Sequence, residues 1–184
     1  LDPGGKFRLA QGLEQGGEYE RATILYRELY AREPENIVYF DGLQRMLVQT
    51  KRYDDAIALV GERLAARPGD LSLHTTLAGI YQRAGREEDA RQEWARTIAI
   101  APANPNHYRI VASSMIEHRL LDRAAEVYRN GRSACADPFL FTMELAQLLT
   151  VMMDYEGAST ELVAWLRKNP SQVGFIQGRF AAFT

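Results

Sequence analysis

Residues 37–70 read IVYFDGLQRMLVQTKRYDDAIALVGERLAARPGD, and the pattern of this stretch returns along the whole chain. The alanine at its twentieth position has counterparts at an unbroken spacing of 34 residues. The five alanines of this row are Ala22, Ala56, Ala90, Ala124 and Ala158. A fixed period of this length is typical of solenoid proteins, in which each unit buries its apolar face against the next.

Two amphipathic helices fit into this stretch, because apolar residues return at helical spacing over residues 38–49 and again over 54–66. Pro68 ends the second helix, since proline cannot continue the hydrogen-bond ladder. The sequence therefore predicts an all-α solenoid that forms one domain over residues 1–184. Its expected parts are five helix-turn-helix units and a C-terminal partial or capping helix: 3–36, 37–70, 71–104, 105–138, 139–172 and 173–184.

The charge balance disfavours one class of partner. The 184 residues carry a formal net charge of −2, whereas a nucleic-acid-binding surface usually has a basic excess. We therefore expect no nucleic-acid partner. The sequence contains no run of 18 apolar residues, so no membrane insertion is expected.

The compartment is left open between cytoplasm and periplasm. Cys135 is the single cysteine, which excludes an intrachain disulfide and says little about the compartment. The chain begins at Leu1 without an initiator methionine, in a loop-like stretch. We expect it to be excised from a longer chain, in which any upstream signal would be invisible.

No group of residues has the spacing of a catalytic, metal or cofactor site. His74, His107 and His118 lack metal-ligand spacing with one another and with Cys135. His74 is expected to be a partly buried structural residue and Cys135 a loop-packing residue. The predicted class is therefore a protein without enzyme activity, cofactor or metal.

The five units resemble the tetratricopeptide repeat (TPR) family, and the resemblance covers residues 3–172. That family favours small residues at positions 8 and 20 of a 34-residue unit, an aromatic residue at 24 and proline at 32. Residues that carry the match include Leu9, Ala10, Gly17, Ala22, Tyr26 and Pro34 in the first unit, Leu77, Ala78, Gly85, Ala90, Trp94 and Pro102 in the third, and Leu145, Ala146, Ala158 and Pro170 in the fifth.

Departures from the family pattern predict local irregularities. Position 27, where the family places a small residue, holds Leu29, Arg63, Thr97, Gly131 and Trp165. The small residue is therefore missing in four units, and the helix crossing there is expected to differ. Ala136 stands where the fourth unit should have proline, which predicts a distorted second helix or a shifted exit loop. Met153 occupies a position that favours a small turn residue.

The resemblance implies a right-handed superhelix whose first helices line a concave groove that holds peptides or partner segments. The residue set with which one subfamily grips acidic chaperone tails is absent, because Gly42 replaces its middle asparagine. Carried over by position, the groove is mixed in polarity and becomes apolar toward the fifth unit. Its candidate residues are Asp41, Arg45, Gln49, Thr75, Gln82, Arg83, Arg109, Ser113, Leu140, Met143 and Gln147.

Two functions follow from this pattern. The first is a protein-interaction module or scaffold that holds a peptide or partner segment in the groove. The second is an assembly domain that packs against other domains or copies of itself. At the C-terminal end Ile176, Phe180 and Phe183 form an apolar stripe, so we expect either a continuing chain or self-association there. Trp165 is expected to pack on the same segment. RNA-binding helical repeats are disfavoured, since a basic groove is missing.

Overall fold

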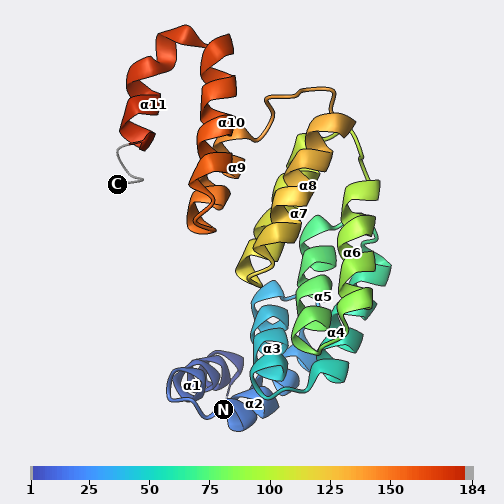
Figure 1. The fold of residues 1–184 in the computed structure, drawn as a ribbon. Coiled ribbons are helices and arrows are strands. Elements are labelled where there is room, and N and C mark those ends of the chain that lie inside the picture. The colour runs from blue at the N-terminus through green and yellow to red at the C-terminus, as the bar shows by residue number, and fades with distance from the viewer. Residues whose placement is uncertain (1, 181–184) are drawn as a thin grey trace. The chain divides into compact units, whose positions relative to one another are not determined.

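The computed structural model describes residues 2–180, except for the side chains of residues 172, 175, 179 and 180. Every regular element in this range is helical, so the all-α prediction is confirmed (Figure 1). The elements are α1 (Pro3–Gln15), α2 (Tyr19–Arg32), α3 (Ile37–Gln49), α4 (Tyr53–Ala66), α5 (Leu71–Arg83), α6 (Glu87–Ala99), α7 (Pro105–Glu117), α8 (Leu121–Ala134), α9 (Thr142–Val151), α10 (Tyr155–Lys168), the short 3₁₀ helix η1 (Pro170–Gln172) and α11 (Val173–Phe180).

Three of the first helices, α3, α5 and α7, begin at a residue whose side chain caps the helix. Asn36 accepts a hydrogen bond from the Val38 amide at 3.1 Å and starts α3, one residue before the predicted start. Asp70 caps α5 in the same way, and Asn104 caps α7. Such side chains satisfy backbone amides that have no partner inside the helix.

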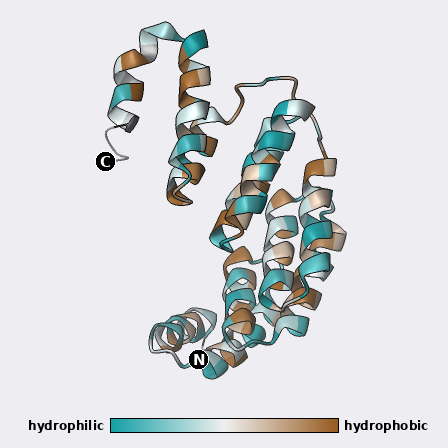
Figure 2. Ribbon diagram, in the orientation of Figure 1, coloured by the Kyte–Doolittle hydropathy of each residue, from teal (hydrophilic) through white to brown (hydrophobic). Residues whose placement is uncertain are grey.

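The chain divides into an N-terminal half (Leu1–Glu93) and a C-terminal half (Trp94–Thr184). In the N-terminal half each helix from α1 to α4 packs against the next one along the chain. In the C-terminal half α7 packs on α8, α8 on α9, and α9 on α10. Hydrophilic and hydrophobic residues are mixed along these helices, as Figure 2 shows, because one face of each is covered and the other is not.

The repeated alanines are fully buried in the packed helices. All five residues of the row that begins with Ala22 are 0% exposed. Ala10, Ala78 and Ala112 from the first helices are also fully buried. A larger side chain at these points would hold the helix backbones apart, since packed helices lie roughly 8–10 Å from axis to axis. The alanines therefore return every 34 residues because each repeat unit needs a small side chain at the same helix contact.

One backbone turn connects the two helices of each pair. The residue at its centre has a positive φ every time, at Gly17, Lys51, Gly85, Arg119 and Met153. The amide of the next residue then donates to a carbonyl five residues earlier, as from Arg52 to Leu47 and from Asp154 to Leu149. This is the Schellman arrangement, which favours glycine. Met153 therefore adopts the turn despite its side chain, with a φ of 61°.

The irregularity predicted around Ala136 affects the loop and not the helix. The helix α8 is continuous, so the alternative of a distorted helix was wrong. The exit loop is shifted instead: Ala136 has a φ of 52° and Phe141 a φ of 61°, and α9 starts only at Thr142. Without proline the chain leaves α8 through a left-handed residue, and this consumes the residues that would have begun the next helix.

At position 27 the unusual residues are accommodated individually. The guanidinium of Arg63 lies 4.5 Å from the centre of the Phe40 ring and donates to the Pro34 carbonyl at 3.2 Å. Gly131 has the opposite role, because a Cβ there would come within 3.0 Å of Phe141 and Tyr108. The side chain at this position therefore sets how closely the neighbouring helix approaches.

The C-terminal segment is helical as far as the structure describes it. Ile176 on α11 is 1% exposed and packs with Ala146 and Leu162, and Trp165 lies against the same cluster. Direct packing of Trp165 on the C-terminal segment stays a prediction, because the cluster that it contacts also includes residues of α9 and α10. Phe183 and the side chain of Phe180, the other members of the predicted apolar stripe, lie outside the described residues.

Candidate interaction surface

The exposed face of α3 carries three of the predicted groove residues. Asp41, Arg45 and Gln49 are exposed, whereas the opposite face of the helix, with Leu43 and Met46, is buried. Spacings of four residues place all three side chains along one side of a helix. The N-terminal half therefore presents a continuous polar stripe on α3.

Arg45 is held in place by a carboxylate from α1. Its Nε donates to Glu14 Oε1 at 3.0 Å and its Nη2 donates to Oε2 at 3.1 Å, across 31 residues of sequence. The hydroxyl of the buried Tyr26 donates to the same carboxylate at 2.7 Å. Three helices, α1, α2 and α3, thus meet at Glu14.

The hydrogen bonds of this network determine which of its groups are ionised at neutral pH. Burial alone would raise the pKa of Glu14, but hydrogen bonds from Arg45 and Tyr26 together lower it. Burial raises the pKa of Tyr26, and the hydrogen bond to Glu14 raises it further. At neutral pH the network is therefore a carboxylate between a neutral phenol and a guanidinium. The positive charge predicted for Arg45 is balanced within the N-terminal half.

The predicted residues on α5 have a different environment. Thr75 is half-buried, and its hydroxyl donates to the Leu71 carbonyl at 3.0 Å. Arg83 is exposed. Within the described chain, the side-chain oxygen of Gln82 is buried and accepts no hydrogen bond. Gly79, on the same helix, is buried.

A second arginine–glutamate pair lies in the C-terminal half. Arg109 on α7 donates from Nε and Nη2 to Glu144 Oε1 on α9, at 3.1 and 3.0 Å. Its guanidinium also lies 5.2 Å from the ring centre of Phe141, which packs on Tyr128. Burial and the nearby Glu144 carboxylate raise the pKa of Tyr128, while Arg109 and a hydrogen bond from Ser113 oppose the shift.

The apolar end predicted for the groove is partly covered. Leu140 is half-buried, and Met143 packs against the cluster of Ala146, Leu162 and Ile176. Gln147, in contrast, is exposed. The large apolar side chains that remain exposed near the end of α9 are Val151, at 63%, and Met153, at 76%.

The predicted residues fall into two separate groups. Six belong to the N-terminal half and five to the C-terminal half. Each group contains one arginine that is bonded to a glutamate of a neighbouring helix. The structure thus joins Arg45 to Glu14 and Arg109 to Glu144, and neither glutamate was among the predicted residues.

A surface hollow was not predicted from the sequence. It has a volume of about 450 Å³ and lies between the exposed face of α2 and the turn after α3. Its lining residues are Glu20, Thr23, Ile24, Arg27, Glu28, Ala31, Thr50 and Arg52, none of which is a predicted groove residue. The one signal in the sequence was Ile24, an apolar residue outside the buried stripe of α2 and 59% exposed.

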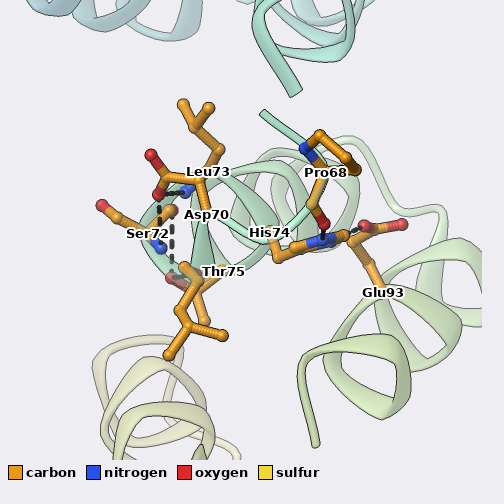
Figure 3. A network of polar contacts seen from close by, with 8 residues as sticks. Pro68, Asp70, Ser72, Leu73, His74, Thr75 and Glu93 are labelled. Carbon is orange, nitrogen blue, oxygen red and sulfur yellow. Dashed lines mark hydrogen bonds and ion pairs between the residues drawn. The ribbon is translucent and has the colours of Figure 1, made fainter. Parts of the chain in front are cut away.

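The histidines and the cysteine considered for chemistry have structural partners. His107 Nδ1 donates to the Thr97 carbonyl at 2.9 Å, and Cys135 Sγ lies 3.4 Å from the Ala103 carbonyl. His74 is buried between Pro68 and Glu93 (Figure 3). Over residues 2–180 no group of three or more acidic, histidine or cysteine residues is arranged to hold a metal ion. None of the described helices is long and apolar enough to cross a membrane.

The comparisons with known proteins agree with this fold. A family model described as tetratricopeptide repeat matches residues 47–113. No curated protein sequence matches the chain significantly. Among solved structures, residues 41 to the end of MamA from Desulfovibrio magneticus RS-1 are 16% identical and superpose with a TM-score of 0.51, over 94% of this chain and 98% of that one.

Another solved structure extends the similarity. TTC0263, described as a thermophilic TPR protein of Thermus thermophilus, is 16% identical, covers 98% of both chains and has a TM-score of 0.50. At this level of identity the similarity concerns the fold. It places the chain with all-α solenoids of helix pairs.

Proposed function

Because this chain belongs to the tetratricopeptide repeat family, we propose that the exposed faces of its first helices bind a segment of a partner protein. Members of the family are in general non-catalytic scaffolds, and the family match supports a protein-interaction or scaffold module. Binding along the first helices is the finer step that we add. It rests on what those helices expose and on how their charges are held.

The observation that carries the proposal is the polar stripe on α3. Asp41, Arg45 and Gln49 are exposed at spacings of four residues, on a helix whose opposite face is fixed in the core. Val38, at the start of the same helix, is 50% exposed and adds an apolar contact. A rigid helix with both kinds of group suits binding, because little conformational entropy is lost when a partner docks.

Glu14 and Glu144 orient Arg45 and Arg109 but do not occupy all of their hydrogen-bond donors. A guanidinium has five N–H donors. Two donors of each arginine bind Glu14 or Glu144, so three remain. The side chains are 52% and 47% exposed, which leaves these donors within reach of a ligand. Carbonyl and carboxylate oxygens of a peptide are the matching acceptors.

The charge balance predicts a modest role for electrostatics. Since each guanidinium is already paired with a carboxylate, a strongly acidic segment gains less than it would from free arginines. Charged contacts at an exposed rim chiefly set the association rate and the choice of partner. We therefore expect affinity to fall with salt, but less steeply than for an acidic-tail receptor.

The proposal is tested by selecting ligands and then locating them. A displayed library of random peptides is panned against the chain, and a selected peptide is titrated into ¹⁵N-labelled protein. The expected result is a set of shifted amides on α3 and on the facing helices of the same half. Shifts confined to α2 and the turn after α3 would move the binding site to the surface hollow.

An assembly role is the second candidate, and a separate observation favours it. Val151 and Met153 expose apolar side chains around the turn between α9 and α10, and Ile24 does so beside the hollow on α2. Exposed apolar residues of this kind mark association surfaces when they cluster. Sedimentation over a wide range of protein concentration separates the candidates, since a strict monomer contradicts self-association.

A further inference from the structure

The second helices of the first and the last repeat unit, α2 and α10, each expose one stripe of side chains. Residues spaced by four, three and four positions lie along one side of a helix. On both helices every residue at these positions is exposed, and the opposite side is buried. Each stripe is about 16 Å long. The stripe on α2 consists of Glu20, Ile24, Arg27 and Ala31, and the stripe on α10 of Glu156, Thr160, Val163 and Arg167.

A branched apolar side chain near the middle distinguishes these two stripes from those of the helices between them. Ile24 is 59% exposed and Val163 is 39% exposed. The corresponding middle positions of the other second helices hold small, polar or charged residues. These are Ala58 and Gly61 on α4, Gln92 and Ala95 on α6, and Glu126 and Arg129 on α8. Among the second helices, an apolar centre is therefore a feature of α2 and α10.

On α2 one charged group of the stripe lacks a partner. Arg27 lies 3.8 Å from Asp55, which also binds Arg52. Glu20 has no ion pair within the described residues. Because Glu20 and Ile24 are four residues apart, their side chains are neighbours on the helix surface. A ligand that suits this face therefore carries a positive charge beside an apolar group.

The stripe on α10 offers these two groups. Arg167 follows Val163 by four residues, so its positive charge lies beside the apolar side chain. Neither Arg167 nor Glu156, at the opposite end of the stripe, has an ion pair within residues 2–180. Glu161, outside the stripe, is already bound to Arg132 on α8. The charge of Arg167 is therefore available to a partner.

We propose that the stripe on α2 of one copy of this chain binds the stripe on α10 of a second copy, with the two helices antiparallel. Glu20 then lies opposite Arg167, and Ile24 lies opposite Val163. The contact pairs two charges that have no partner in the single chain and covers two exposed apolar side chains. This inference rests on the assembly role given above as the second candidate function, and it is independent of peptide binding by the first helices.

The remaining positions also match in this register. Arg27 faces Thr160, and Ala31 faces Glu156. The Thr160 hydroxyl donates its hydrogen to the Glu156 carbonyl at 2.9 Å, so its oxygen can accept a hydrogen bond from Arg27. The small side chain of Ala31 leaves room for the carboxylate of Glu156, within one turn of Arg27. The stripes are therefore complementary along their whole length.

A parallel arrangement of the two helices fits less well. With the two apolar residues face to face, Arg167 would lie opposite Glu28, which is already bound to Lys6. Glu20 would remain without a cation. The antiparallel arrangement also brings the positive end of each helix dipole to the negative end of the other. The distribution of charge thus selects the direction of the helices.

The surface around α2 has room for the partner's apolar side chain. All four residues of the α2 stripe line the hollow of about 450 Å³ described above, and the turn after α3 lines it as well. Insertion of Val163 into this hollow removes apolar surface of both copies from water, which favours association. The charges at the rim then fix the register and the choice of partner.

Complementary charge reversals test the pairing by sedimentation velocity. Glu20→Arg and Arg167→Glu each place like charges opposite one another. Each variant alone is expected to associate with a constant lower than that of the parent chain by about tenfold or more. Mixed in equal amounts, the two variants should associate again, because every contact between unlike copies then joins opposite charges. The double variant Glu20→Arg/Arg167→Glu should recover association for the same reason.

Asp122→Arg is the matched control. Asp122 has the same repeat position on α8 as Glu20 on α2, is exposed, and is also an acidic residue in the first turn of its helix. Its reversal therefore has the same effect on the helix dipole, but it should leave association unchanged. An equal loss of association in Asp122→Arg and Glu20→Arg would overturn the proposal.

The other outcomes separate this pairing from the functions proposed above. A strictly monomeric parent chain would contradict the assembly role itself. Association of the parent chain that neither Glu20→Arg nor Arg167→Glu weakens would overturn only the pairing of α2 with α10. A loss in Glu20→Arg alone would place the contact between two α2 helices and would also overturn it. Affinity for a peptide bound by the first helices should be the same in every variant.

Discussion

The ring of Tyr26 on α2 fills the space that a side chain on Gly42 of α3 would need. A Cβ built on Gly42 would lie 2.8 Å from Cζ of that ring and nearer still to two other ring carbons. From this position the Tyr26 hydroxyl reaches Glu14, which in turn binds Arg45. The missing side chain at residue 42 therefore sets where the charged groups of the exposed stripe lie.

Gly42→Ala is expected to destabilise the chain by about 1–3 kcal/mol, the usual cost of overpacking a core contact. The reason is that Tyr26 must give way, and it is 1% exposed. Urea unfolding measures the effect. Gly61→Ala is the control, because nothing lies within 4 Å of a Cβ there. That variant should be stabilised by up to about 1 kcal/mol, since alanine is the better helix former. Equal behaviour of the two variants would contradict the packing described.

Ala90→Leu is expected to cost about 1–3 kcal/mol for the same reason, since Ala90 is 0% exposed at a helix contact. Ala95→Leu places the same side chain on the exposed face of α6 and should be close to neutral. Thermal and urea unfolding compare them. A neutral result at Ala90 would show that the helices there are not in tight contact.

Met153→Gly is expected to stabilise the chain by about 0.5–1 kcal/mol. A left-handed conformation costs an ordinary residue about 1–2 kcal/mol, and the entropy of glycine returns about 0.5–1 of that. Met153 is 76% exposed, so little packing is lost. The matched reverse change is Gly85→Ala, at the same turn position with a φ of 74° and open space around it, and it should destabilise. A gain of stability in both variants would rule out backbone strain as the cause.

Protonation of Glu14 is expected to lower the free energy of unfolding in acid. Its pKa is lowered in the folded chain, although burial opposes the shift, because Arg45 and Tyr26 bind the carboxylate. A lowered folded pKa stabilises the fold above the unfolded value, near 4.3, and this contribution disappears as pH falls through the folded value. The difference in unfolding free energy between the parent chain and Glu14→Gln should therefore shrink below about pH 4.

Glu62→Gln, at an exposed position on α4, is the control for the acid experiment. It should show no such change. A difference between the parent chain and Glu14→Gln that stays constant from neutral to acid pH would mean that the carboxylate is not selectively stabilised.

The helices, their turns and the alanine contacts could be predicted from the sequence because they depend on residues close together in the chain. The repeat spacing placed Ala56 in the core, and Pro68 marked the end of α4. The late start of α9 was only half predicted. The missing proline signalled a change, but the left-handed conformations of Ala136 and Phe141 depend on how the loop packs.

The charged contacts were beyond prediction for a different physical reason. Glu14 and Arg45 are 31 residues apart, and their pairing depends on the angle between α1 and α3. Position in the repeat identified Arg45 as exposed but could not name its partner. His74 was expected to be a partly buried structural residue, whereas its contact with Glu93 on the next helix became visible only in the folded structure.

Binding by the exposed faces of the first helices is tested most directly with the double variant Arg45→Ala/Arg109→Ala. Both arginines are about half exposed while Glu14 and Glu144 are 22% and 33% exposed, so each pair contributes about 1 kcal/mol to stability and the melting temperature should fall only slightly. A control variant, Arg91→Ala/Arg129→Ala, removes the same charge from exposed positions on the second helices α6 and α8. The measurement is the affinity of all three proteins for a peptide selected on the parent chain. We predict a clear loss for the first variant and none for the control, whereas unchanged affinity in the first variant would contradict binding at this face.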